Sequence, residues 1–170
     1  MNLLDRLRAI KPTAWVVLAF IVAIILGVLS AIDAHAEPGG HTGFRVALGR
    51  TVVNSSATFG EFGYEFPSGW ELTGTAMGAT DTVRGQQGEV QALSFSRVVR
   101  PDWHLAGANV YMRLGVAYVD GAELIGDTNF RLGLGLEWQR VLQIEYVHWS
   151  SAGIHQPNTG IDGIQIRFIY

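Results

Sequence analysis

The segment Phe130-Arg131-Leu132-Gly133-Leu134-Gly135-Leu136-Glu137-Trp138 alternates between large apolar residues and small or charged residues. Side chains two positions apart on a β-strand point to the same side, so this segment predicts a strand with one apolar face. The opposite face carries Arg131 and Glu137. An apolar face opposite a polar or small face is typical of a strand in a membrane β-barrel, where lipid lies outside and a polar lumen inside.

Seven further segments carry the same kind of alternation, although the one at Glu89 to Val99 alternates poorly. They are Phe44 to Gly49, Phe62 to Phe66, Trp70 to Gly78, Glu89 to Val99, Val110 to Tyr118, Leu142 to Tyr146 and Ile164 to Tyr170. We therefore predict an all-β fold, an eight-stranded antiparallel outer-membrane β-barrel. In a barrel of eight strands, side chains fill the interior, so we do not expect a pore. Arg131 is expected to pair there with Glu137 or Glu145, since buried charges need partners.

The connections between these segments alternate in length, as they do in membrane barrels. Turns are predicted at Ser68-Gly69, Arg100-Pro101-Asp102 and Gln139-Arg140, on the periplasmic side that also holds both chain ends. Longer extracellular loops are predicted at Thr80–Gly88, Asp120–Thr128 and Ser151–Ile161. Four tryptophans are interpreted as aromatic residues at the membrane interfaces, namely Trp70, Trp103, Trp138 and Trp149.

The composition limits the class of protein. A chain of 170 residues suits one domain, and its net charge of −3 argues against nucleic acid as a partner. Only 16% of the residues are charged, yet only one apolar run is long enough to cross a bilayer as a helix. The chain has no cysteine, which excludes disulfides and thiolate metal sites. No metal and no organic cofactor are expected.

The first 36 residues have the pattern of an export signal. Three basic residues precede an apolar run from Ala14 to Ile32, and small residues at Ala34 and Ala36 offer a signal peptidase site. We predict a cleaved signal peptide at 1–36 and a barrel domain at 37–170. The alternative is an uncleaved anchor, because the apolar run could span a bilayer. His35 and His41 are interpreted as residues flanking the processed end, not as metal ligands.

Near the end of the chain, His148, Ser150 and Asp162 supply the parts of a base-activated serine nucleophile. All three share the parity of the lipid-facing residues on their strands, and the two strands are expected to pair. The three side chains would then meet on the outer wall, at the rim beside the extracellular leaflet. A histidine facing lipid is costly, so this placement favours a function. Backbone N–H groups around Gly153, or the Asn158 amide, could hold an oxyanion.

The pattern His148-x-Ser150-x-Ala152-Gly153-Ile154, followed by Gln156-Pro157-Asn158-x-Gly160-Ile161-Asp162, resembles the lipid A 3-O-deacylase (PagL) family. The resemblance implies an outer-membrane barrel that removes the 3-O-linked acyl chain from lipid A of lipopolysaccharide. It also implies His148, Ser150 and Asp162 as the catalytic triad, with Gly153 and Asn158 at the oxyanion. The family usually has glutamate where this chain has Asp162, and asparagine where it has Ser151.

Other interpretations of the same residues stay open. His148 could be an interfacial residue, Ser150 a loop residue and Asp162 a loop cap; Ser151 as the nucleophile is disfavoured, because its parity points it into the lumen. The alternative function is a non-enzymatic small barrel, an OmpX- or OmpA-like structural or adhesion protein. A third is a soluble periplasmic or anchored β-protein. Whether the protein forms a homodimer, and whether calcium assists, also stay open.

Overall fold

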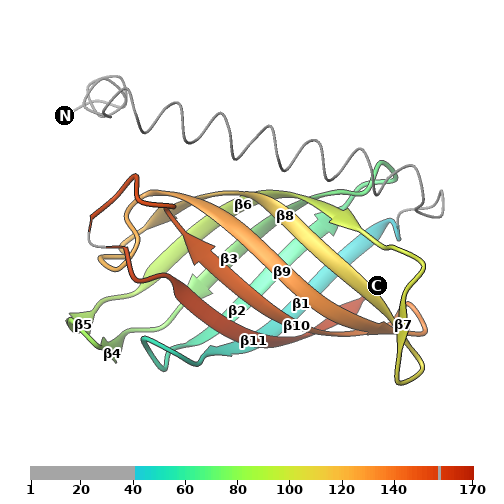
Figure 1. Cartoon of the computed structure of the whole chain (residues 1–170), viewed down its shortest axis with the longest axis horizontal. Helices are drawn as coiled ribbons and strands as arrows, with labels where there is room; N and C mark the ends of the chain where they lie inside the picture. Colours follow the sequence, from blue (N-terminus) through green and yellow to red (C-terminus); the bar gives the residue numbers. More distant parts are fainter. Residues whose placement is uncertain (1–40, 157) are drawn as a thin grey trace.

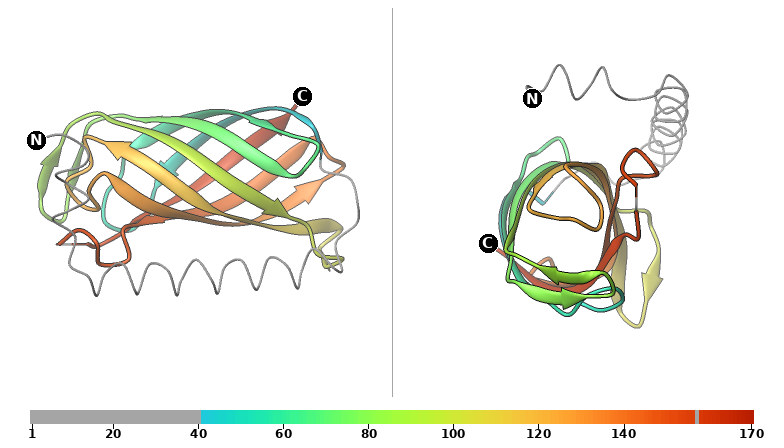
Figure 2. Two further views of the ribbon diagram at one scale, coloured as in Figure 1. Left: turned by 90° about the horizontal axis from the view of Figure 1, so that it is seen from above. Right: turned by 90° about the vertical axis from the view of Figure 1, so that its left-hand side faces the viewer.

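The structure, a computed structural model, describes residues 41–156 and 158–170, and these form a closed antiparallel barrel (Figures 1 and 2). The barrel strands are β1 (Gly43–Thr51), β2 (Thr58–Glu65), β3 (Trp70–Met77), β6 (Val90–Val99), β8 (Ala108–Asp120), β9 (Thr128–Trp138), β10 (Leu142–Ser150) and β11 (Ile161–Ile169). The predicted signal peptide lies outside the described residues. Within the described ranges no helix is long and apolar enough to cross a membrane.

Each barrel strand pairs with the next along the chain, and β1 pairs with β11 to close the ring. The view along the barrel in Figure 2 shows this ring. Phe44 and Tyr170 exchange backbone hydrogen bonds of 3.1 and 3.0 Å, so the two ends of the barrel domain lie side by side. We call this end of the barrel the termini end and the opposite end the loop end. The predicted eight-stranded antiparallel barrel is confirmed.

The alternation read from the sequence separates an apolar outer wall from a polar lumen. Leu134 on β9 is 56% exposed, whereas Arg131 on the same strand is fully buried. Strand β6, which alternates poorly by hydropathy, follows the same geometry. Its outward residues include Leu93 and Phe95, and its inward residues include Ser94 and Ser96, both fully buried. The inward side of β6 is small rather than charged, which explains why its pattern is weak in the sequence.

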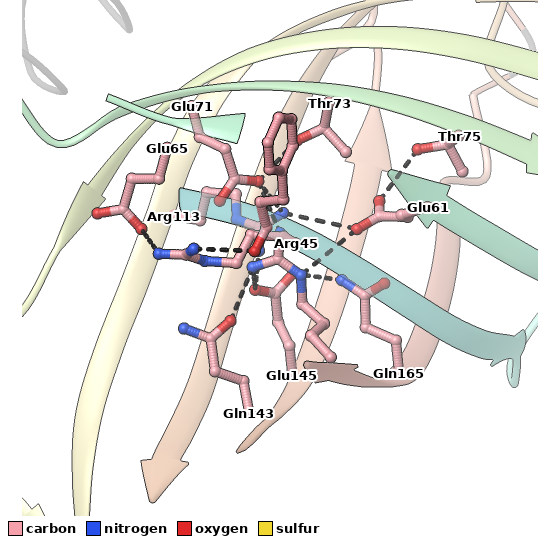
Figure 3. A network of polar contacts seen from close by, with 12 residues as sticks. Arg45, Glu61, Glu65, Glu71, Thr73, Thr75, Arg113, Gln143, Glu145 and Gln165 are labelled. Atoms are coloured by element: carbon pink, nitrogen blue, oxygen red, sulfur yellow. Dashed lines mark hydrogen bonds and ion pairs between the residues drawn. The ribbon is translucent and has the colours of Figure 1, made fainter. Parts of the chain in front are cut away.

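Arginines and glutamates fill the lumen as a connected network (Figure 3). Arg113 lies 2.7 Å from Glu145 and 3.2 Å from Glu71, and Arg167 lies 2.7 Å from Glu71. All four side chains are essentially fully buried. Buried charges are tolerated when each has an opposite charge and hydrogen bonds around it. The network therefore closes the interior, as expected for a barrel of this size.

The main partner of Arg131 differs from the prediction. Arg131 hydrogen-bonds Glu61 on β2, across the lumen, and Glu145 is more distant at 3.8 Å. Glu137 does not pair with Arg131; its Oε2 accepts hydrogen bonds from Gln143, at 2.6 Å, and from Arg100. The prediction failed for Glu137 because residues 131 and 137 lie on one strand, six positions apart, at different depths of the lumen.

Charged residues also close the termini end. Arg100, just after β6, lies 2.7 Å from Glu65 and 3.2 Å from Glu137. His41 Nδ1 lies 3.4 Å from Glu137. Burial and the nearby Arg100 guanidinium lower the pKa of His41 below its ordinary value. His41 therefore belongs to this cluster and does more than flank the processed end.

Two connections contain more structure than the sequence indicated. The predicted tight turn at Arg100-Pro101-Asp102 is wrong, because the connection extends to Gly107 and contains β7 (His104–Leu105), which pairs with the start of β8. The predicted exposed loop at Thr80–Gly88 holds a hairpin of β4 (Thr80–Thr82) and β5 (Gly85–Gln87). Figure 1 places this hairpin at the loop end and β7 at the termini end.

Trp149 is not an interfacial residue, contrary to the interpretation from the sequence. Its side chain is fully buried in the lumen, with its ring 5.3 Å from the Arg131 guanidinium and 5.6 Å from the ring of Phe59. Trp149 follows His148 on β10, so when one faces outward the other must face inward. By contrast, Trp103 is exposed, and Trp70 stacks on Phe95 outside the barrel.

Replacing Glu145 with Gln tests the lumen network. Glu145 accepts hydrogen bonds from Tyr111, Arg113 and Gln165. The substitution removes the nearest carboxylate of the buried Arg113 and leaves Glu71, at 3.2 Å, as its nearest remaining opposite charge. Because charged hydrogen bonds are lost, the free energy of unfolding should fall by about 2 kcal/mol. Urea unfolding in detergent micelles, followed by tryptophan fluorescence, measures this change. The matched control is Glu123→Gln, because Glu123 is an exposed glutamate in the loop between β8 and β9. Equal stability of the two variants would contradict the network's role.

Candidate functional site on the outer rim

Strands β10 and β11 bring His148, Ser150 and Asp162 to the loop end of the outer wall. The two strands pair directly, as predicted, and His148 lies opposite Asp162 in their register. The side chain of His148 is 30% exposed and that of Asp162 is 11% exposed. Leu132 and Phe130, on β9, are the partners of His148 and Ser150 on the other side of β10. The candidate site is therefore set in the apolar outer wall.

His148 and Asp162 form a close pair. Nδ1 of His148 lies 2.7 Å from Oδ1 of Asp162. Side chains directly opposite each other on antiparallel strands start about 5 Å apart at Cβ, so even the short aspartate reaches the imidazole. With the carboxylate ionised, Nδ1 is the nitrogen that carries the proton in neutral imidazole. The remaining nitrogen, Nε2, is then free to accept a proton.

Ser150 contacts the loop that follows it. Its Oγ lies 3.0 Å from the Asn158 side-chain amide and accepts a hydrogen bond of 3.3 Å from the backbone N–H of Ala152. Between the described residues His148 and Ser150 no hydrogen bond is present. The two residues lie two positions apart on one face of β10, so their Cα atoms are about 7 Å apart. The structure thus pairs His148 with Asp162, and Ser150 with Asn158, in neighbouring positions.

Backbone donors converge beside Ser150. Ala152 and Gly153 both adopt left-handed conformations, with φ of 49° and 86°. Successive N–H groups in a turn of this kind can point to one concave spot. When the Asn158 amide presents its oxygen, that oxygen accepts the N–H groups of Ala152 and Gly153 at 3.2 and 3.3 Å as well as the Ser150 hydroxyl. The predicted residues Gly153 and Asn158 therefore both lie next to Ser150.

Two other loops hold the loop between β10 and β11. Asn54, in the loop between β1 and β2, donates a hydrogen bond of 2.6 Å to the carbonyl of Thr159. The backbone N–H of Thr159 donates to Leu124 in the loop between β8 and β9, at 3.2 Å. Ser151 is fully buried, as its parity predicted, and its Oγ accepts the N–H of His155. These bonds fix the backbone that carries Asn158.

The sequence marks Gly160 only as a motif residue and assigns no role to Gly160 or Tyr146. A Cβ on Gly160 would lie 2.7 Å from Cε1 of His148, so only glycine lets the imidazole take this position. The hydroxyl of Tyr146 donates a hydrogen bond to Oδ1 of Asp162. Tyr146 shares the parity of His148, a signal that could have placed it here. Across the described ranges, no group of three His, Asp or Glu side chains could hold a metal ion.

A closed barrel with an apolar wall and a charged lumen defines the class of small membrane-spanning β-barrels, here with a polar site on the rim of the wall. A family model described as lipid A 3-O-deacylase (PagL) matches residues 52–170. The chain belongs to this family. Its family and fold are those of an outer-membrane lipid A deacylase, a hydrolase.

A solved structure of the family supports this fold. The crystal structure of the outer membrane enzyme PagL is 20% identical, with a TM-score of 0.52, and the match covers 75% of this chain and 99% of that chain. The Yersinia pestis outer membrane protein Ail, solved in a phospholipid bilayer nanodisc, is 15% identical. Its TM-score is 0.41, and the match covers 76% of this chain and 99% of Ail. No curated protein sequence matches.

Gly160→Ala tests the fit of the imidazole. The added methyl group meets His148, and a side chain is also strained at the φ of +69°. Displacement of the imidazole by about 1 Å can lower the rate of an enzyme by about a hundredfold, and we expect at least a tenfold loss of lipid A deacylation. The matched control is Gly107→Ala, with a similar φ of +76° and no atom near the added Cβ. Equal activity of the two variants would rule out the steric role of Gly160.

Proposed function

We propose that the protein hydrolyses the 3-O-linked acyl ester of lipid A with Ser150 as nucleophile, His148 as general base and Asp162 as the acid that orients His148. The observation that carries the proposal is the 2.7 Å contact between His148 and Asp162 on the outer wall, beside a serine on the same face of β10. An ionised carboxylate on Nδ1 leaves Nε2 as the proton acceptor, which is the arrangement a serine nucleophile needs.

In the proposed reaction, His148 Nε2 takes the Ser150 hydroxyl proton as Oγ attacks the ester carbonyl. The tetrahedral intermediate collapses when the sugar hydroxyl leaves and takes the proton from His148. The acyl group is then bound to Ser150, and water, activated by the same imidazole, releases it as a fatty acid. Nε2 and Oγ must come within hydrogen-bond range for the first step, and such contacts often tighten only when substrate is bound.

The donors around Ser150 suit the charge that develops in this reaction. The N–H groups of Ala152 and Gly153 lie beside Ser150, where the carbonyl oxygen of an attacked ester would become negative. The Asn158 amide adds a donor when its NH2 group, rather than its oxygen, faces Oγ. Fixed donors of this kind stabilise the transition state without rearranging. We assign Gly153 and Asn158 to this role. The hydrogen bond that the loop backbone accepts from Asn54 and the one that it donates to Leu124 would keep the donors in place.

The place of the site suits a substrate that lies in the outer leaflet. His148 and Asp162 are on the outer wall at the loop end, flanked by apolar residues such as Leu132 and Ile164. The longer loops of membrane barrels face the outside of the cell, so in the proposed orientation this end is extracellular. A lipid can present an ester there without leaving the membrane, and its acyl chains can lie along the apolar wall. We therefore expect lipopolysaccharide as the partner, reached sideways through the leaflet. A homodimer is not required for this reaction.

Ser150→Ala and His148→Ala are each expected to lower the rate of acyl release from lipid A by a factor on the order of a thousand or more. Each substitution removes an essential reacting group. Mass spectrometry of lipid A from cells expressing each variant measures the loss of the acyl chain. The temperature-dependent shift of folded barrels on electrophoresis reports whether the variants fold. If lipid A from cells that express the wild-type protein had the same mass as lipid A from cells without it, the non-enzymatic barrel would be favoured.

Ser151→Ala is the matched control for the nucleophile. Ser151 neighbours Ser150 but is fully buried on the lumen side, where an ester in the outer leaflet cannot reach it. This variant should retain most of the acyl release. If Ser151→Ala were inactive and Ser150→Ala active, the assignment of the nucleophile would be wrong.

Asp162→Asn should lower the rate of acyl release by about a hundredfold or more. The amide no longer carries the charge that stabilises the imidazolium, and it can favour the wrong tautomer of His148. Measurement of initial rates on purified lipid A in detergent gives the factor. A rate equal to that of the wild type would remove Asp162 from the proposed triad while leaving Ser150 and His148 in place.

A further inference from the structure

Tyr146 contacts the proposed triad from the lipid-facing wall. It lies on β10, two residues before His148 and on the same face. In the register of β10 and β11 it is opposite Ile164, so Asp162 is its diagonal neighbour. Diagonal neighbours lie about 7 Å apart, a distance that a tyrosine side chain can span. Its hydroxyl donates to Oδ1 of Asp162, the same oxygen that accepts the proton on Nδ1 of His148.

This contact distinguishes Tyr146 from the other aromatic residues of the outer wall. Tyr146 is 45% exposed, as expected for a residue that faces lipid. Phe44, Phe62 and Phe95, which also face outward, pack on other aromatic rings and have no polar group. Tyr146 instead directs its hydroxyl at a carboxylate that is mostly buried. The Tyr146 hydroxyl thus hydrogen-bonds the Asp162 carboxylate instead of pointing into the lipid.

We propose that Tyr146 is a positioning residue that holds the Asp162 carboxylate in the orientation that His148 needs. This inference rests on the proposed function, and it assigns to the site a fourth side chain. Tyr146 acts through Asp162 and His148 and does not touch the ester.

The physical reason lies in the freedom of a short carboxylate. Asp162 can turn about its side-chain bonds, and a turn away from His148 would take Oδ1 out of reach of Nδ1. Two donors that converge on Oδ1 from different directions oppose that rotation. A hydrogen bond to a charged group is also stronger than one between neutral groups, and more so beside an apolar wall. The hydrogen bonds from Tyr146 and His148 to Oδ1 therefore hold the Asp162 carboxylate in one orientation.

Tyr146→Phe removes only the hydroxyl and tests the proposal. A hydrogen bond to a charged group contributes enough that its loss should lower kcat for lipid A deacylation about tenfold. KM should stay within about twofold, because a group that acts through the base affects the chemical step and not the binding of lipid. The matched control is Tyr118→Phe: Tyr118 also faces outward, and its strand, β8, is separated from β10 by β9. This control should leave both constants unchanged.

A second arm repeats Tyr146→Phe in an Asp162→Ala background, where the hydroxyl has no carboxylate to hold. The second substitution should then cause no further loss of kcat, because coupled residues give non-additive effects. An undiminished additional loss would overturn the proposal. So would wild-type kcat in Tyr146→Phe, equal effects of Tyr146→Phe and Tyr118→Phe, or a raised KM with kcat unchanged, the sign of a residue that only packs against acyl chains.

Ser150→Ala in the same assays separates this inference from the proposed function. Undiminished acyl release by Ser150→Ala would reject the proposed mechanism as a whole. An inactive Ser150→Ala together with wild-type kcat in Tyr146→Phe would reject the role of Tyr146 alone. The shift of folded barrel on electrophoresis, measured for every variant, shows that each loss of activity occurs in a folded protein.

Discussion

The register between β10 and β11 is the constraint on which the candidate site depends. It sets His148 opposite Asp162, and it turns both side chains to the outer wall. Because side chains alternate, a slip of one residue in β11 would place the carboxylate in the lumen and leave the histidine without it. The lumen face of the same two strands opposes such a slip. Arg167 donates to Gln143 at 2.9 Å, and Gln165 donates to Glu145 at 2.8 Å, each across one rung of the ladder.

The charged lumen and the site on the outer wall are thus two faces of one piece of sheet. Glu145 also binds Arg113 on β8, which connects the strand pair to a strand two positions away around the ring. A lumen filled in this way resists deformation, because each shift would separate buried opposite charges. Catalytic groups on a rigid wall keep their geometry better than groups on a free loop. The fold therefore uses its interior for stability and leaves its outer surface for the proposed chemistry.

The sequence predicted the parts of this structure that depend on local periodicity. The faces of β9 and β10, the pairing of the last two strands and the outward placement of His148 and Asp162 all follow from parity. Contacts between strands on opposite sides of the lumen do not follow from parity. The partner of Arg131 is Glu61, 70 positions earlier in the chain, and that pairing is set by how the ring closes. Trp149 is the exception: a tryptophan near a strand end suggests the membrane interface, whereas its parity places it in the lumen, where it is buried.

The candidate site combines residues on strands with residues in a loop. The strand pattern of the sequence predicts the positions of the strand residues but not those of the loop residues. His148 and Asp162 are held by the ladder, whereas Asn158 and Gly160 reach the site through a loop whose backbone is fixed by Asn54 and Leu124. The sequence motif marks the loop residues, but not the bonds from two other loops that hold them. Gly160 joins the two parts, because its missing side chain lets the loop pass against the imidazole. The loop can then lie close to the strand pair while the imidazole stays on Asp162.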